Sequence, residues 1–117
     1  WWIVDPKNAM ALPSRLSQMV VFELPEVNSS AAVYWYDDTG SGQCRVPASW
    51  RLDYLTSSGT WQPVAGASAY GRALNAYNNV TFTAVTTTAL RVVAQLQAGV
   101  SGGILQWNTN ATPAAAR

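Results

Sequence analysis

The stretch NVTFTAVTTTALRVVAQL, residues 79–96, decides the fold class. Apolar side chains such as Val80 alternate with threonine in its first part, and apolar and polar side chains alternate again in its last part. Successive side chains of a β-strand point to opposite faces, so this period of two predicts strands with one buried and one solvated face. We therefore expect two strands, 79–85 and 90–96, joined by the link 86–88.

The same alternation recurs along most of the chain, and the helical period is almost absent. Further strands are predicted at 19–24, 31–36, 50–55, 61–64 and 103–107. Many short strands with one polar face are typical of antiparallel sheets, because a parallel sheet needs helices between its strands. The sequence therefore predicts an all-β chain, folded as an antiparallel β-sandwich.

The connections between these strands fall into two length classes. The links 25–29, 57–60 and 86–88 are short, whereas 1–18, 37–49, 65–78 and 97–102 are long. If successive strands run antiparallel, short and long connections lie at opposite ends of the sandwich. Long loops held by a rigid scaffold often carry binding residues, so we expect a site at the long-loop end.

Chain length predicts a single domain. The protein has 117 residues, enough to bury a core without disulfides or metal. We expect one β-sandwich module over residues 1–110. Residues 111–117 contain Pro113 and several alanines and are expected to form a flexible tail or linker.

Composition excludes several kinds of chemistry. The chain has no histidine and one cysteine, Cys44, which rules out zinc sites built from His and Cys as well as His-dependent nucleophilic catalysis. Asp37 and Asp38 are adjacent and the other carboxylates are dispersed, so no pair recommends itself for glycoside hydrolysis. We therefore expect a protein that is not an enzyme, with Cys44 as a packed side chain and no cofactor.

Charge and hydropathy exclude other partners. The chain has seven basic and six acidic residues, and the basic residues are scattered along it. Both observations argue against nucleic acid and anionic membranes as partners. No apolar run is long enough to span a bilayer. A monomer is expected.

Four motifs carry a resemblance to a known family: YWYDDTG (34–40), CRVPASWR (44–51), VTFTAVTTTALR (80–91) and GGILQW (102–107). Together they resemble a discoidin-like (coagulation factor type C) module, as found at the C-terminal end of bacterial glycoside hydrolases related to β-L-arabinofuranosidases. The resemblance implies a jelly-roll β-sandwich in a secreted bacterial protein, binding sugars through loops at one end. The resemblance is compatible with a structural calcium ion, but the sequence does not indicate one.

The loop after Tyr36 offers groups suited to sugar recognition. Asp37, Asp38 and Arg45 lie within a few residues of one another, and carboxylates and an arginine fork pair well with vicinal hydroxyls. The alternative is that the aspartates and the arginine pin the loop internally. The sequence leaves both interpretations open.

Aromatic residues supply the second kind of group, because their faces can cover the C–H-rich face of a sugar ring. The candidate ligand contacts are Trp1, Trp2, Tyr36, Tyr70 and Tyr77, with Arg72 beside Tyr70. Trp35, Trp50 and Trp61 fall in strand patterns and are expected in the core.

These features predict a non-catalytic carbohydrate-binding module that targets an attached glycoside hydrolase to a polysaccharide. Two alternatives stay open: a structural accessory domain that packs on the catalytic domain, and a discoidin domain that binds protein or lipid. Lipid binding calls for exposed apolar residues in the loops, and loop 37–49 carries charged and small polar residues instead.

Overall fold

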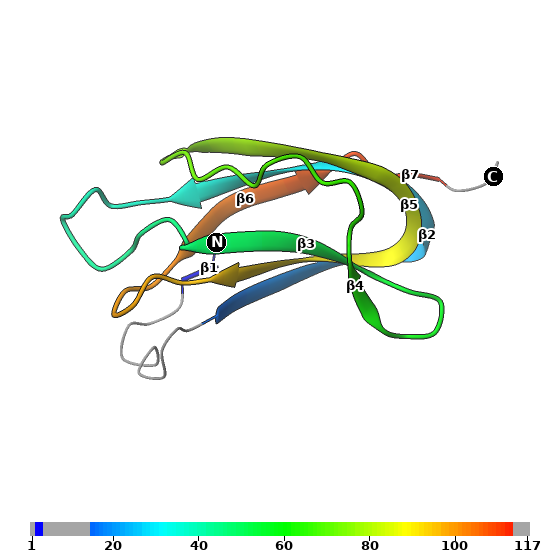
Figure 1. The fold of residues 1–117 in the computed structure, drawn as a ribbon, viewed down its shortest axis with the longest axis horizontal. Coiled ribbons are helices and arrows are strands. Elements are labelled where there is room, and N and C mark those ends of the chain that lie inside the picture. Colours follow the sequence, from blue (N-terminus) through cyan, green and yellow to red (C-terminus); the bar gives the residue numbers. More distant parts are fainter. Residues whose placement is uncertain (1, 4–14, 114–117) are drawn as a thin grey trace.

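The described residues form antiparallel β-strands and no helix. The computed structural model describes residues 2–3 and 15–113, and no helix that might cross a membrane occurs within these ranges. The strands are β1 (Trp2–Ile3), β2 (Arg15–Tyr36), β3 (Ser49–Leu55), β4 (Trp61–Pro63), β5 (Ala76–Gln95), β6 (Gly103–Thr109) and β7 (Thr112–Pro113). They pair in the order β1-β6-β2-β5-β3-β4, with β7 also on β2 (Figure 1). The predicted all-β antiparallel sandwich is confirmed.

The two long strands β2 and β5 bend together and fold the sheet over on itself. Their ladder is regular as far as Val21 opposite Ala89, shifts register between Val21 and Glu26, and shifts again between Asn28 and Ser30. Figure 1 shows both strands curving at the same end of the molecule. Because bulges increase twist and bend a strand without ending its ladder, one sheet supplies both layers of the sandwich.

This bend corrects one sequence expectation. Segments 25–29 and 86–88 are predicted as links between separate strands, and both instead lie inside continuous strands. Glu26 still pairs with Thr87 within the bend. The hydrogen bonds of this ladder satisfy backbone N–H and C=O groups within the bend. In a turn between separate strands these groups would need other partners.

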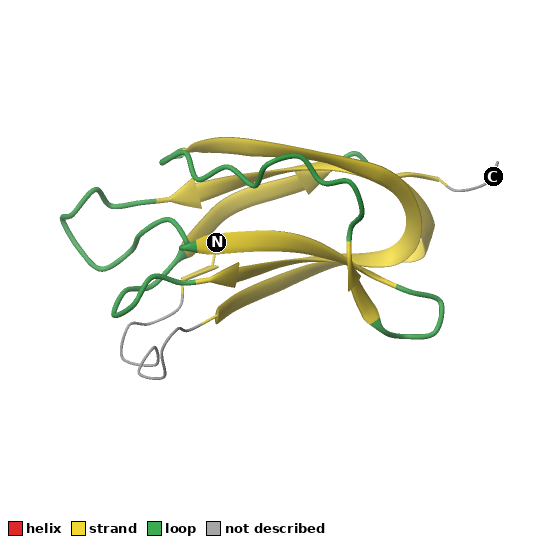
Figure 2. Cartoon of the chain, in the orientation of Figure 1, coloured by secondary structure: helices red, strands yellow, loops and turns green. Residues whose placement is uncertain are grey.

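The fold-back gives two layers, which we name after the strands that only one of them contains. The β6 layer holds β1, β6, residues 30–36 of β2 and residues 76–85 of β5. The β3 layer holds β3, β4, residues 15–21 of β2 and residues 89–95 of β5. Figure 2 shows the two layers lying one above the other.

Apolar side chains on the inner sides of both layers form the core. Trp35 and Trp50 meet edge to face with ring centroids 5.6 Å apart, which confirms their predicted core positions. Fully burying a large apolar side chain contributes about 1.5–3 kcal/mol. Trp61, also expected there, instead lies half-buried with the Arg91 guanidinium 4.5 Å from its ring centroid. The other fully buried apolar side chains include Val33, Leu52, Val80, Leu90, Val92 and Ile104.

Segment 64–75 covers the flank of the sandwich beside β5. It runs along the edge of β5, where the Thr83 N–H donates to the Ala65 carbonyl (2.9 Å) and the Ser68 N–H to the Thr81 carbonyl (2.8 Å). These bonds satisfy an edge that would otherwise be exposed. The segment starts at the β3 layer, where the Val64 N–H donates to the Leu52 carbonyl (3.0 Å), and ends at the β6 layer, where the Asn75 N–H donates to the Trp35 carbonyl (3.0 Å).

Two long loops meet at the end opposite the bend. Loops 37–48 and 97–102 are joined by a hydrogen bond from the Arg45 N–H to the Ser101 carbonyl (3.0 Å). The short loop 56–60 lies at the other end of the molecule (Figure 2). Two of the four connections predicted to be long, 37–49 and 97–102, thus meet at one end, whereas 65–78 runs along the flank beside β5 and most of 1–18 lies outside the described residues.

The segment predicted as a tail begins with a paired strand. Thr112 and Pro113 form β7 and lie opposite Val27 and Glu26 of β2. Residues 114–117 lie outside the described part of the chain.

Candidate functional site

We call residues 37–48, 70–75 and 97–102 the loop rim. Within it, Asp37 is buried and its carboxylate faces inward. The carboxylate accepts hydrogen bonds from the backbone N–H groups of Thr39 (2.7 Å) and Val46 (3.0 Å). Both carboxylate oxygens of Asp37 therefore hold the loop in shape, and the buried side chain is not available to a ligand at the surface.

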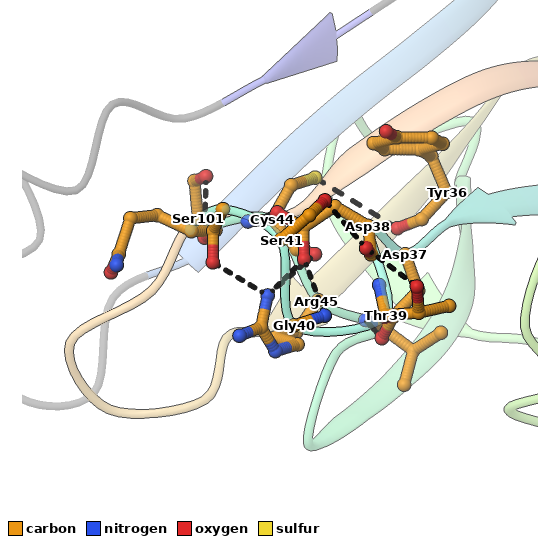
Figure 3. Close-up of polar contacts among 12 residues, drawn as sticks. Tyr36, Asp37, Asp38, Thr39, Gly40, Ser41, Cys44, Arg45 and Ser101 are labelled. Carbon is orange, nitrogen blue, oxygen red and sulfur yellow. Dashed lines mark hydrogen bonds and ion pairs between the residues drawn. The ribbon is translucent and has the colours of Figure 1, made fainter.

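Asp38 and Arg45 bind each other across the same loop (Figure 3). The Asp38 carboxylate also accepts hydrogen bonds from the N–H groups of Cys44 (2.8 Å) and Gly40 (3.0 Å). The Arg45 guanidinium donates to the Gly42 carbonyl (2.9 Å). This geometry corresponds to the alternative that these residues pin the loop.

The charge of Asp38 fits this role. Desolvation alone would raise the pKa of its carboxyl, but hydrogen bonds from the N–H groups of Cys44, Gly40 and Gly42 outweigh it, and the positive charge of Arg45 adds to them. The net result is a pKa below the ordinary value. The carboxylate is held in its ionised form by the loop itself.

Cys44 has the environment of a packed side chain. It is buried, and its thiol lies 3.8 Å from the Tyr36 carbonyl. Burial first, and then the negative charge of Asp38, raise the pKa of the thiol. A raised pKa disfavours the thiolate, which is the nucleophilic form.

Tyr70 turns inward from the rim and anchors segment 64–75. Its ring meets Trp50 at 4.9 Å between centroids, and its hydroxyl oxygen accepts a hydrogen bond from the Leu52 N–H (3.2 Å). The Trp50 indole N–H donates to the Gly71 carbonyl (2.8 Å). Arg72 is exposed, and its Nε donates to the Pro47 carbonyl (2.7 Å), which ties two rim loops together.

The paired tryptophans are only partly described. The backbone of Trp2 pairs with Ile104 of β6, so Trp2 lies at the edge of the β6 layer. Trp1 and the side chain of Trp2 lie outside the described part of the structure. Their predicted contact with ligand stays a prediction.

Tyr36 and Tyr77 belong to a different surface, the outer face of the β6 layer. On this face Tyr34 stands between two cross-strand neighbours, Tyr77 of β5 and Gln106 of β6. The two rings meet edge to face at 5.2 Å, and the Tyr77 hydroxyl donates to the Gln106 side-chain carbonyl. Tyr36 lies two residues beyond Tyr34 on the same face of β2.

Two further cross-strand rows continue this face toward the bend. Ala32 lies opposite Asn79 on one side and opposite Asn108 on the other. In the next row Ser30 lies opposite Thr81, and the Asn110 N–H donates to the Ser30 carbonyl (3.2 Å). Residues of these two rows line a shallow depression of about 370 Å³.

The sequence interpretation missed Tyr34, Gln106, Asn79 and Asn108. The alternation that buries Val33 also directs Tyr34 outward, so a signal for Tyr34 was present. The neighbours on β5 and β6 depend on strand pairing and leave no such signal in the sequence.

The fold of this chain is similar to that of a chain of known structure. No protein-family model matches the chain. A solved chain of the Streptococcus pneumoniae β-galactosidase BgaA, described as architecturally intricate with multiple functions, is similar in fold, with a TM-score of 0.71 and 18% sequence identity. The match covers 88% of this chain and 75% of that chain. At this identity the likeness establishes a shared β-sandwich fold, and the discoidin-like family stays a prediction.

Proposed function

We propose that this chain is a non-catalytic carbohydrate-binding module of a secreted bacterial glycoside hydrolase, of the discoidin-like type. The observation that carries the proposal is the row Tyr77–Tyr34–Gln106 on the outer face of the β6 layer. Tyr77 is 43% exposed, so its ring is accessible to a ligand. The fold shared with a chain of a β-galactosidase supports the glycosidase context.

The chemistry of this row suits a sugar. A tyrosine ring offers an apolar face together with a polar hydroxyl, and such residues are favoured at surfaces that bind ligands. The Gln106 amide provides both a donor group and an acceptor for hydroxyls. Tyr36 and Tyr77, both predicted ligand contacts, stand on this face. In the proposal the predicted residues that lie in the loop rim, Asp37, Asp38, Arg45 and Tyr70, position loops.

The absence of catalysis is part of the proposal and has its own support. Glycoside hydrolysis needs two carboxyl groups facing each other across a bound sugar. Asp37 and Asp38 are engaged in the internal contacts of the loop, and Asp53 binds Arg51 and Arg91. The carboxylates of these three aspartates are thus occupied by structural partners.

One observation favours a second function alongside the first. Met19, Val21 and Leu24 of β2 are each more than half exposed, at 59%, 66% and 53%. Large exposed apolar side chains close together in sequence are typical of a surface that packs on another domain. We propose that this segment rests on an attached catalytic domain while the β6 layer faces the polysaccharide.

Affinity electrophoresis in gels containing different polysaccharides tests the sugar-binding function. The native chain should be retarded by at least one polysaccharide, and Tyr77→Ala should weaken binding about tenfold, or about 1.4 kcal/mol. Trp61→Ala is the matched control, because this aromatic lies in the other layer. Circular dichroism verifies that both variants are folded. Free migration of the native chain in every gel, or a Tyr77→Ala variant that binds normally, would refute the proposal.

A further inference from the structure

We infer that the outer face of the β6 layer holds a neutral oligosaccharide of more than one sugar residue, which extends from the tyrosine row into the depression beside Ala32. This inference rests on the proposed function, since it specifies the ligand class of the same face. It adds a binding subsite, formed by Ala32, Asn79 and Asn108, to the tyrosine row.

The row around Ala32 has the shape of a trough. Asn79 and Asn108 flank Ala32 as its direct cross-strand neighbours, so a methyl group lies between two longer amides. Cross-strand neighbours have Cβ atoms about 4.5–5.5 Å apart, which makes Ala32 the floor of a trough with amide walls. The depression of about 370 Å³ that these residues help to line falls within the range of ligand sites.

The walls of the trough offer hydrogen-bonding groups to a ligand. Asn79 and Asn108 are exposed, and no hydrogen bond of either side-chain amide is found within the described residues. Each amide offers a carbonyl acceptor and two N–H donors, which match a pair of neighbouring sugar hydroxyls. The Asn110 side chain, in contrast, is committed to Ser29 and Ser30 and fixes the far end of the trough.

The trough is continuous with the tyrosine row. Tyr77 and Asn79 are two residues apart on β5, and Gln106 and Asn108 are two residues apart on β6. Two residues of strand span about 6.6–6.8 Å, and their side chains share a face. A sugar chain lying along the strands would therefore contact the rings at one point and the amides at the next.

The outer face of the β6 layer is uncharged along these rows. The side chains of the three rows are aromatic, amide, hydroxyl or methyl groups, none of them charged at neutral pH. The charged pair of the neighbouring loop, Asp38 and Arg45, is bound to itself. A carboxylate or sulfate on the ligand would lose hydration without gaining a cation, which is costly. The face thus favours neutral sugars over uronates.

Calorimetric titration with oligosaccharides of increasing length tests the inference. The neutral probes are the mono- to hexasaccharides of galactan, arabinan, xylan and glucan, and the charged probes are oligogalacturonates and heparin fragments. For the neutral series that binds, affinity should rise about tenfold from the monosaccharide to the tetrasaccharide. It should change less than twofold between low and high salt, since no ion pair is involved.

Two variants separate the trough from the tyrosine row. Ala32→Ile fills the floor of the trough without adding a ring on which a sugar could stack, and it should abolish the gain in affinity with chain length. Ala84→Ile introduces the same group at an exposed alanine in β5, outside the lining of the trough, and should behave like the native chain.

The possible outcomes distinguish the inference from the function that it specifies. Flat affinity along every neutral series, native-like binding by Ala32→Ile, or preference for the charged probes overturns the inference and leaves carbohydrate binding in place. No binding of any probe, neutral or charged, overturns both.

Discussion

Asp37 and Asn75 join two rim loops through a reciprocal pair of hydrogen bonds. The Asp37 N–H donates to the Asn75 side-chain carbonyl (3.0 Å), and the Asn75 side-chain amide donates to the Asp37 carbonyl (2.9 Å). Asn75 has a φ of 52°, in the left-handed region that asparagine tolerates better than most residues. One side chain therefore replaces a missing stretch of strand pairing just after β2 ends.

Asn75→Ala should lower the free energy of unfolding by about 1–3 kcal/mol. The substitution removes both hydrogen bonds and places a residue with a Cβ but no compensating polar group at positive φ. Asn75→Gly loses the same bonds but fits the backbone, so it should lose less. Urea unfolding followed by tryptophan fluorescence measures both. Equal stability of Asn75→Ala and the native chain would contradict this role.

Stability should fall in acid partly because of Asp38. Its pKa is lower in the folded chain than the ordinary value, so the ionised carboxylate stabilises the fold at all pH values above the unfolded pKa of about 3.9. That contribution is lost as the pH falls through the lower folded pKa.

Asp38→Asn should therefore be less stable than the native chain at neutral pH and should decline less steeply toward pH 3. Urea titrations at a series of pH values measure the slope. Glu23→Gln, at an exposed position of β2, serves as the control and should leave the slope unchanged. Parallel curves for Asp38→Asn and the native chain would argue against the loop contacts as the cause.

Cys44 should resist thiol reagents in the folded protein. Its thiol is buried, and burial together with the charge of Asp38 raises its pKa, so both access and thiolate population are low. Reaction with a chromogenic disulfide at pH 8 should be slow in buffer and fast in urea. A Gln43→Cys, Cys44→Ala double variant places the thiol at an exposed neighbour and should react at once. Rapid labelling of native Cys44 would show that the loop opens.

Asp53 should be a strong determinant of the stability of the β3 layer. It is 2% exposed and accepts hydrogen bonds from Arg51 Nε (2.9 Å) and Arg91 Nε (3.0 Å). Asp53→Ala should lower the free energy of unfolding by about 1–3 kcal/mol, because it leaves two partly exposed guanidinium groups without their carboxylate partner. Arg51→Ala should cost less than about 1 kcal/mol, because its side chain is 43% exposed. Thermal unfolding of the two variants provides the comparison, and the reverse order would contradict the assignment.

Most strand positions are readable from the sequence, but their connections are not. The alternation around Val33 and Trp35 correctly indicates which side chains point inward. Segments 25–29 and 86–88 look like turns, because a bend inside a strand and a turn between strands use similar residues. The register shifts that distinguish them arise from pairing between residues far apart in the chain.

The site is less predictable than the fold. Asp37, Asp38 and Arg45 have the residue types of a binding loop, and the structure shows that they bind one another and the backbone. A residue type gives the chemistry that a side chain can perform, whereas its partners decide whether that chemistry is available to a ligand. Burial and hydrogen-bond geometry are set by packing, which one sequence does not contain.

The amino-acid sequence alone determined the period of the strands and the faces that enter the core, because both depend on neighbours along the chain. Its composition excluded histidine chemistry, because the chain contains no histidine. Folding in three dimensions decided that Tyr34, Tyr77 and Gln106 form one row and that Ala32 lies between two asparagines. The reason is register: a shift of one residue in either ladder would turn the partners of Tyr34 and Ala32 to the opposite face.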